Sequence, residues 1–105
     1  MKAHYDQQPD KLTHDNDGTS VFRWNIQKED EGWSCEEIRF SGDATPANIK
    51  RHIIRAKYNE TEEFAIINKY NAVRLGILED ESAVQRYMDY LQFTFALDEI
   101  ISGNE

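Results

Sequence analysis

The sequence predicts an α+β fold, an N-terminal antiparallel β-hairpin or three-stranded meander followed by three α-helices. Apolar residues alternate along residues 21–27, which is the period of a half-buried strand. From Thr45 onward, apolar residues recur at helical spacing and capping residues mark the helix starts. Strands followed by a run of helices are typical of the α+β class.

The hairpin is expected over residues 21–41. In VFRWNIQ, one strand face carries Phe22, Trp24 and Ile26, and KEDEG follows as the turn. The returning strand, WSCEEIRF, alternates less regularly. Its apolar residues fall on two parities, with Trp33 and Cys35 on one and Ile38 and Phe40 on the other. A bulge near Glu36-Glu37 would place all four on the core side.

Residues 1–20 are expected to be a partly mobile N-terminal segment. KAHYD is a weaker candidate for a third strand. The stretch QQPDKLTHDNDGTS, residues 7–20, is rich in turn-forming residues and predicts a long mobile loop.

Residues 45–102 are expected to form a three-helix unit within a single domain spanning 1–105. Thr45 is the expected N-cap of the first helix, with Pro46 at its first position. Thr61 is the expected cap of the second helix, which Gly76 ends. The third helix begins at EDES and runs to about Ile101. Because the second helix is apolar almost all round, we expect it to be central and covered on more than one side.

Composition narrows the range of functions. Twenty acids against twelve bases give a net charge of -8, which argues against general affinity for nucleic acid. There is no apolar run of signal-peptide or membrane-spanning length. We therefore expect an acidic cytoplasmic protein with no membrane partner.

No pattern in the chain indicates an enzyme. There is no glycine-rich phosphate loop, nucleophile elbow or His-x-x-x-His pair, and His4, His14 and His52 lack metal-ligand spacing. An EF-hand aligned on Gly18 would place Thr13 and Trp24 where acids are required. The single cysteine, Cys35, stands next to two acids, which lower thiol reactivity. We expect no catalytic residue, cofactor or metal.

The first helix carries an isolated cluster of positive charge. Residues 45–59 hold four bases and no acid, whereas residues 1–44 hold five bases and ten acids. Ile49, Ile53 and Ala56 form a stripe roughly 60° wide that is expected to face inward. Ile54 lies among the bases. If it is buried, the bases are a solvated helix face; if it is exposed, it is an apolar contact rimmed by charge. The candidate partner contacts are Lys50, Arg51, Ile54, Arg55 and Lys57.

The third helix begins with one apolar stripe, formed by Val84, Tyr87, Met88, Leu91 and Phe95. After Leu91 its apolar residues point to every side. One small domain cannot readily bury so many apolar side chains. The end of the helix is therefore either a dimer or partner surface, or packed against the strands. The candidate self-association residues are Tyr90, Phe93, Leu97, Ile100 and Ile101.

From Val21 to Phe95 the chain resembles a group of small proteins encoded in phage or prophage regions of gut bacteria. The resemblance rests on a tryptophan-containing hairpin (VFRWNI, GWSCEEI), an IKRHIIRAKY helix, an EEFAIINKYNA helix and a YMDYLQF segment. It implies a phage genomic context and favours particle or assembly roles over metabolism. It implies no catalytic residue.

The leading hypothesis is a non-enzymatic protein–protein interaction or assembly module of phage or prophage type that forms a homo-oligomer. The alternative is a nucleic-acid-binding regulator that uses the basic helix 45–59. The turn at residues 59–61 has helix-turn-helix length. The candidate recognition helix, however, contributes only Lys69 and Arg74 as bases.

Overall fold

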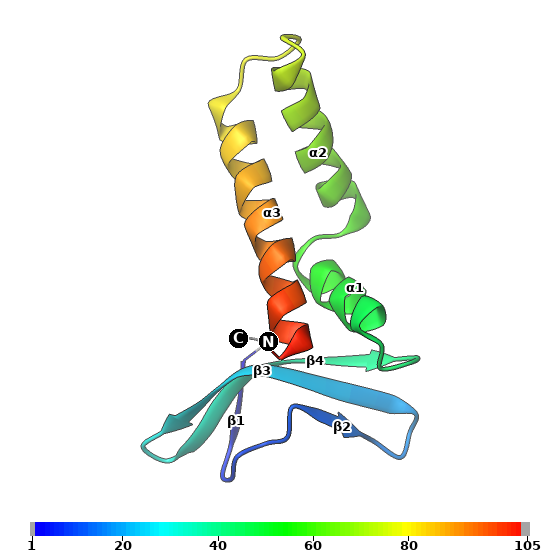
Figure 1. The fold of residues 1–105 in the computed structure, drawn as a ribbon, viewed down its shortest axis with the longest axis vertical. Helices are drawn as coiled ribbons and strands as arrows, with labels where there is room; N and C mark the ends of the chain where they lie inside the picture. Colours follow the sequence, from blue (N-terminus) through cyan, green and yellow to red (C-terminus); the bar gives the residue numbers. More distant parts are fainter. Residues whose placement is uncertain (1, 104–105) are drawn as a thin grey trace. The chain divides into compact units, whose positions relative to one another are not determined.

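The computed structural model describes residues 2–103 and confirms the α+β class (Figure 1). Its elements, in chain order, are β1 (Lys2–Tyr5), β2 (Leu12–His14), β3 (Thr19–Glu29), β4 (Gly32–Ser41), α1 (Pro46–Lys57), α2 (Glu60–Arg74) and α3 (Glu81–Ser102). The sheet has four strands, one more than the expected meander. None of the helices within 2–103 combines the length and apolar character needed to cross a membrane.

The chain divides into two compact units, the first ending at His52 and the second beginning at Ile53. The boundary falls within α1. The first unit contains the sheet and the start of α1, and the second contains the end of α1 with α2 and α3. The expectation of a single domain over 1–105 stays a prediction.

The sheet of the first unit is antiparallel throughout and has the strand order β1-β4-β3-β2 (Figure 1). The predicted hairpin is present as β3 and β4, joined at the Glu29–Gly32 pair. Gly32 has φ +118°, and a Cβ built there would lie 2.3 Å from the backbone oxygen of Tyr5. Glycine at this position therefore allows β1 to approach the end of the hairpin.

The expectation of an unstructured loop over residues 7–20 is wrong, because β2 lies within it. Leu12, Thr13 and His14 pair with Phe22, Val21 and Ser20 of β3. The turn that follows is held by Asp17, whose carboxylate accepts hydrogen bonds from the Thr19 backbone N–H at 3.1 Å and hydroxyl at 2.6 Å. A three-residue strand is too short for alternation to reveal it.

The hairpin contains one bulge, but the predicted position near Glu36-Glu37 is wrong because the bulge lies in β3. The register shifts between Trp24 and Gln27 of β3, where Asn25 has φ 53°, and β4 has no shift near Glu36-Glu37. Cys35 and Phe40 therefore lie on opposite faces of a regular strand, and both are buried. The irregular alternation in β4 arises because both faces of the sheet bury side chains.

A buried arginine joins the two edges of the sheet. The Arg23 Nε donates to the Tyr5 hydroxyl of β1 at 3.2 Å, and its Nη1 donates to the Thr13 hydroxyl of β2 at 3.0 Å. Its charge is balanced by Glu37, with 3.4 Å between Nε and Oε1. Tyr5 also donates to the Glu37 carboxylate, and this hydrogen bond is the main cause that raises the pKa of Tyr5.

The helix starts are set by local capping. As predicted, the Thr45 hydroxyl accepts from the Asn48 backbone N–H at 3.2 Å. The predicted cap Thr61 is wrong, because Asn59 is the N-cap of α2 and forms a capping box with Glu62. Asp80 caps α3, and its carboxylate accepts from the Ser82 backbone N–H at 3.0 Å.

Replacing Gly32 by alanine should strongly destabilise the first unit. The alanine would have an unfavourable positive φ, and its Cβ would clash with the backbone oxygen of Tyr5. A backbone atom cannot move aside as the end of a flexible side chain can. We expect Gly32→Ala to lower the free energy of unfolding by about 3 kcal/mol or more, measured by urea denaturation.

Gly18→Ala is the matched control. Gly18 also has a positive φ, +85°, but an added Cβ would meet nothing within 4 Å. Gly18→Ala should lower the free energy of unfolding by about 1–2 kcal/mol, from backbone strain alone. Equal costs for the two variants would contradict the close approach at Gly32.

Candidate protein-interaction surface

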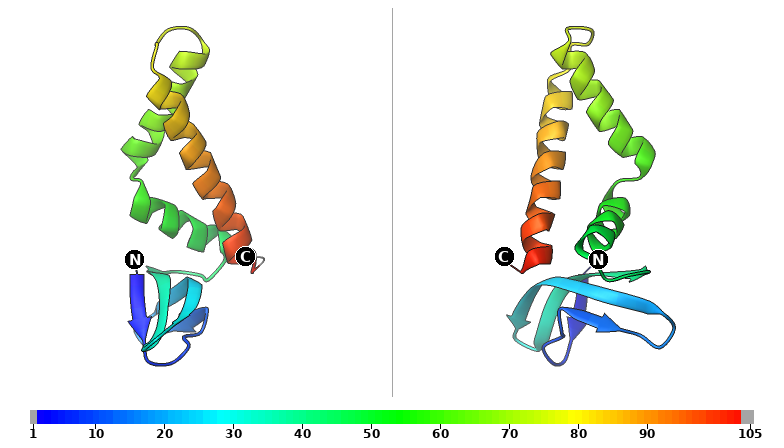
Figure 2. Two further views of the ribbon diagram at one scale, coloured as in Figure 1. Left: turned by 90° about the vertical axis from the view of Figure 1, so that its left-hand side faces the viewer. Right: turned by 45° about the vertical axis from the view of Figure 1, so that its right-hand side comes forward.

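Helices α2 and α3 form an antiparallel helical hairpin, joined by the loop at residues 75–80 (Figures 1 and 2). The rings of Tyr70 and Tyr87 stack across it, with centroids 4.1 Å apart and an interplanar angle of 17°. Tyr58, which follows α1, contacts the rings of Tyr90 and Phe93 edge-on at 5.5 and 5.9 Å. Aromatic contacts therefore run along the length of the hairpin.

The Glu63 carboxylate links all three helical segments of this unit. One oxygen, Oε1, lies 2.9 Å from Nη2 of Arg55 at the end of α1, and the other, Oε2, accepts a hydrogen bond from the Tyr90 hydroxyl of α3. The Tyr90 hydrogen bond, with help from Arg55, lowers the pKa of Glu63 despite partial burial. Burial, and then the carboxylate, raise the pKa of Tyr90 to about 12.

The expectation that α2 is central is wrong, because no residue of α2 is buried. Its side chains are half-buried at best, and Phe64 is 67% exposed. The helix is apolar almost all round, but α3 covers one side of it, so apolar side chains on its other sides remain accessible to solvent.

The predicted self-association residues are divided by the structure. Tyr90 and Leu97 are buried, at 9% and 2% exposed, so neither presents a side chain for contact with another molecule. Phe93, Ile100 and Ile101 are half-buried. The exposed apolar side chains of α3 are instead Phe95, at 64%, and Met88, at 46%. The sequence analysis placed both in the first apolar stripe of the third helix.

The basic cluster is largely engaged within the protein. The Arg51 Nη2 donates to Asn48 at 2.5 Å, Arg55 pairs with Glu63, and the Lys57 ammonium lies 4.5 Å from the centroid of the Phe93 ring. Lys50 and Ile54 are half-buried. Ile49 and Ile53 are buried as expected, but Ala56 is exposed, so the predicted inward stripe ends at Ile53.

Helical geometry places the exposed apolar residues on one side of the hairpin. On α3, Val84, Met88, Leu91 and Phe95 form a stripe about 120° from the buried line of Ala83, Tyr90 and Leu97. On α2, Phe64 lies about 120° from the side of Glu63 and Tyr70 that meets α3, with Ile67 between. In each helix the stripe follows the inward side by about 120° in the direction of the right-handed helical turn. Because the two helices are antiparallel, this turn brings both stripes to the same side of the hairpin. We call this surface the apolar face: Phe64, Ile67, Val84, Met88, Leu91 and Phe95.

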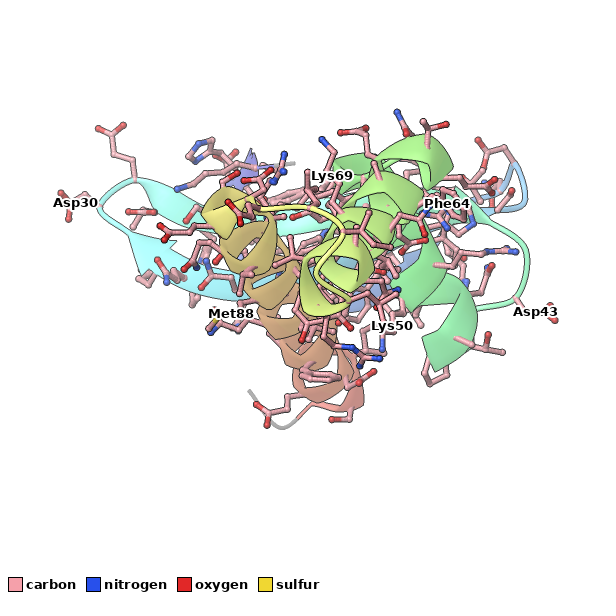
Figure 3. All side chains as sticks on the ribbon, turned by 90° about the horizontal axis from the view of Figure 1, so that it is seen from above. Asp30, Asp43, Lys50, Phe64, Lys69 and Met88 are labelled. Carbon is pink, nitrogen blue, oxygen red and sulfur yellow. The ribbon has the colours of Figure 1, made fainter. Side chains whose placement is uncertain are left out.

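The opposite side of the hairpin carries both charged and apolar side chains. It holds an open groove of about 280 Å³ lined by Tyr58, Glu62, Ala65, Ile66, Lys69 and Arg86. Figure 3 labels Phe64, Lys69 and Met88, which project outward at different positions around the two helices. The helical projection places the groove and the apolar face on different sides of the hairpin.

Two observations concern metal-ligand groups and the single cysteine. Among residues 2–103, no three His, Cys, Asp or Glu side chains are grouped as a metal would require. Cys35 is buried, and this burial, followed by the charge of Glu37, raises the pKa of its thiol. A thiol of this kind is a poor nucleophile.

Comparisons of the chain with protein-family models, with curated proteins and with solved structures found no match.

The Glu63 interactions make a testable contribution to acid stability. The pKa of Glu63 is lowered in the folded protein, so its contribution is present above the ordinary value of 4.5 and is lost as pH falls through the folded value. Glu63→Gln should therefore be less stable than wild type at pH 7, and the difference should shrink below pH of about 4. Urea midpoints measured across this range check it. The matched control is Glu79→Gln, at an exposed acid, which should leave the pH profile near that of wild type.

Proposed function

We propose that this protein is a non-enzymatic protein–protein interaction module whose binding surface is the apolar face of the α2–α3 hairpin. One observation carries the proposal. Phe64 of α2 and Phe95 of α3 are about two-thirds exposed, at 67% and 64%, and the helical projection directs both to the same side of the hairpin.

Scattered exposed apolar residues are common, but a contiguous apolar patch is unusual on a protein that acts alone. Aromatic residues and methionine are enriched in protein interfaces, and charged residues are depleted at their centres. The apolar face holds two phenylalanines and a methionine, with half-buried Ile67, Val84 and Leu91 around them, and none of its six members is charged.

The phage or prophage resemblance gives this proposal a context. An accessory or assembly role in the cytoplasm of a host bacterium would use a surface that binds protein and would need no catalytic activity. Flanking genes for phage tail or capsid proteins would support this context, whereas an operon of metabolic enzymes would count against it.

Nucleic-acid binding ranks lower. Two of the four bases of the cluster contact other side chains in the second unit, Arg55 through Glu63 and Lys57 through Phe93. The net charge of -8 also opposes approach to a phosphate backbone. Tight binding of duplex DNA at low salt, lost on charge reversal of Lys50, Arg51, Arg55 and Lys57, would reverse this ranking.

Site-specific photo-crosslinking in the cells that express the protein tests whether the apolar face binds another protein. The photoreactive amino acid p-benzoylphenylalanine is introduced in place of Phe64 or Phe95, and in place of Lys69 on the opposite side as the control. We expect covalent protein adducts from the two apolar-face positions and few from position 69. Equal adduct yields at all three positions, or none at positions 64 and 95, would contradict the proposal.

A further inference from the structure

We propose that the partner of the apolar face is a second copy of this chain, so that two α2–α3 hairpins close an antiparallel four-helix bundle. A two-fold axis perpendicular to the helices would relate the copies. This inference rests on the proposed function and specifies its partner and its geometry.

The spacing of the apolar face suits helix-on-helix packing. Val84, Met88, Leu91 and Phe95 follow one another at intervals of four, three and four residues. On α2, Phe64, Ile67 and Asn71 follow at intervals of three and four. These intervals put side chains along one seam of a helix, and bundles of four helices pack through such seams. Each hairpin already uses one seam internally, along Ala83, Tyr90 and Leu97, and the apolar face supplies a second.

The available surface is of the right order for a dimer. A phenylalanine side chain can bury about 150–250 Å², so two-thirds of the Phe64 and Phe95 rings amount to about 200–330 Å² per copy. Two copies double this figure to about 400–660 Å², to which Met88 and the half-buried flanking residues add. Specific interfaces begin at roughly 1,200 Å², so the four phenylalanine rings alone supply a third to a half of that area.

Charges at the two ends of α2 favour the antiparallel arrangement. Arg74 ends α2 and has no ion-pair partner among residues 2–103. Glu60 begins α2, and its side chain is 87% exposed, with its carboxylate 4.0 Å from the Arg55 Nε. The two residues are fourteen positions apart, which places them about 40° apart around the helix and about 21 Å apart along it.

Helix α2 therefore carries acidic side chains at its start and the basic Arg74 at its end. Perpendicular two-fold symmetry would bring Arg74 of each copy to Glu60 of the other, twice per dimer. A two-fold axis parallel to the helices would instead stack α2 of one copy on α3 of the other, so Arg74 would not meet Glu60. A basic peptide or a nucleic acid would find no charged side chain among the six residues of the face.

Sedimentation velocity of the full chain over a range of concentrations is the first experiment. We expect a monomer–dimer equilibrium. Phe64→Ser and Phe95→Ser should each raise the dimer dissociation constant at least tenfold, whereas Lys69→Ser on the opposite side should leave it unchanged. Far-UV circular dichroism verifies that each variant keeps its helices. A dimer that persists in both phenylalanine variants would overturn the assignment of the face.

A charge swap tests the antiparallel geometry at exposed positions, where folding is not at risk. Arg74→Glu and Glu60→Arg should each raise the dissociation constant by about twofold to thirtyfold, because two rim ion pairs of about 0.2–1 kcal/mol each are lost. The double variant Arg74→Glu/Glu60→Arg should recover most of the wild-type affinity. Absence of rescue would overturn the antiparallel arrangement.

The experiments can contradict the proposed self-association and the proposed interaction module separately. A strict monomer at all concentrations, with adducts to a different protein at positions 64 and 95, would overturn self-association and leave the interaction module standing. A strict monomer without adducts at these positions would overturn both.

Discussion

The arrangement of the second unit depends on the Glu63 carboxylate, which Tyr90 and Arg55 share. Its two oxygens engage α3 and the end of α1 at once, so the side of α2 that carries Glu63 is fixed toward α3. Residue 64 lies about 100° further around the same helix, so fixing Glu63 inward directs Phe64 outward. The exposure of the apolar face therefore follows from a polar interaction on the adjacent side.

The same interaction engages the end of the basic cluster within the protein. Partial burial of Glu63 would be costly without compensation, and the Arg55 guanidinium and the Tyr90 hydroxyl supply it. Lys57 is placed over the ring of Phe93 two residues further along α1. The end of the basic helix therefore holds the helical segments together, which a charge count along the sequence does not distinguish from a binding surface.

Features fixed by neighbouring residues were predictable. The β3–β4 hairpin follows from alternation and a turn, and the start of α1 follows from Thr45, whose hydroxyl caps the backbone three residues on. Features that depend on pairing between distant segments were not. The bulge at Asn25 was assigned to the partner strand, because irregular alternation in β4 looks the same whether a residue is inserted or a second face is buried.

The sequence did not predict which apolar residues of α3 are exposed. The sequence shows an excess of apolar residues at the end of α3, but it does not reveal that Tyr90 and Leu97 face inward. That choice depends on which side of α3 meets Glu63, a contact between residues twenty-seven positions apart. Phe95, a member of the first apolar stripe, is exposed as a consequence.

The pattern of α2 links these observations. A helix that is apolar almost all round requires neighbours on more than one side. Within the described chain, α3 covers the side of Glu63 and Tyr70, and no residue of α2 becomes buried. The prediction of a central helix was therefore wrong for the single chain, although its physical premise still applies. A second hairpin packed on the apolar face would cover Phe64 and Ile67, and α2 would then have the two neighbours that its sequence requires.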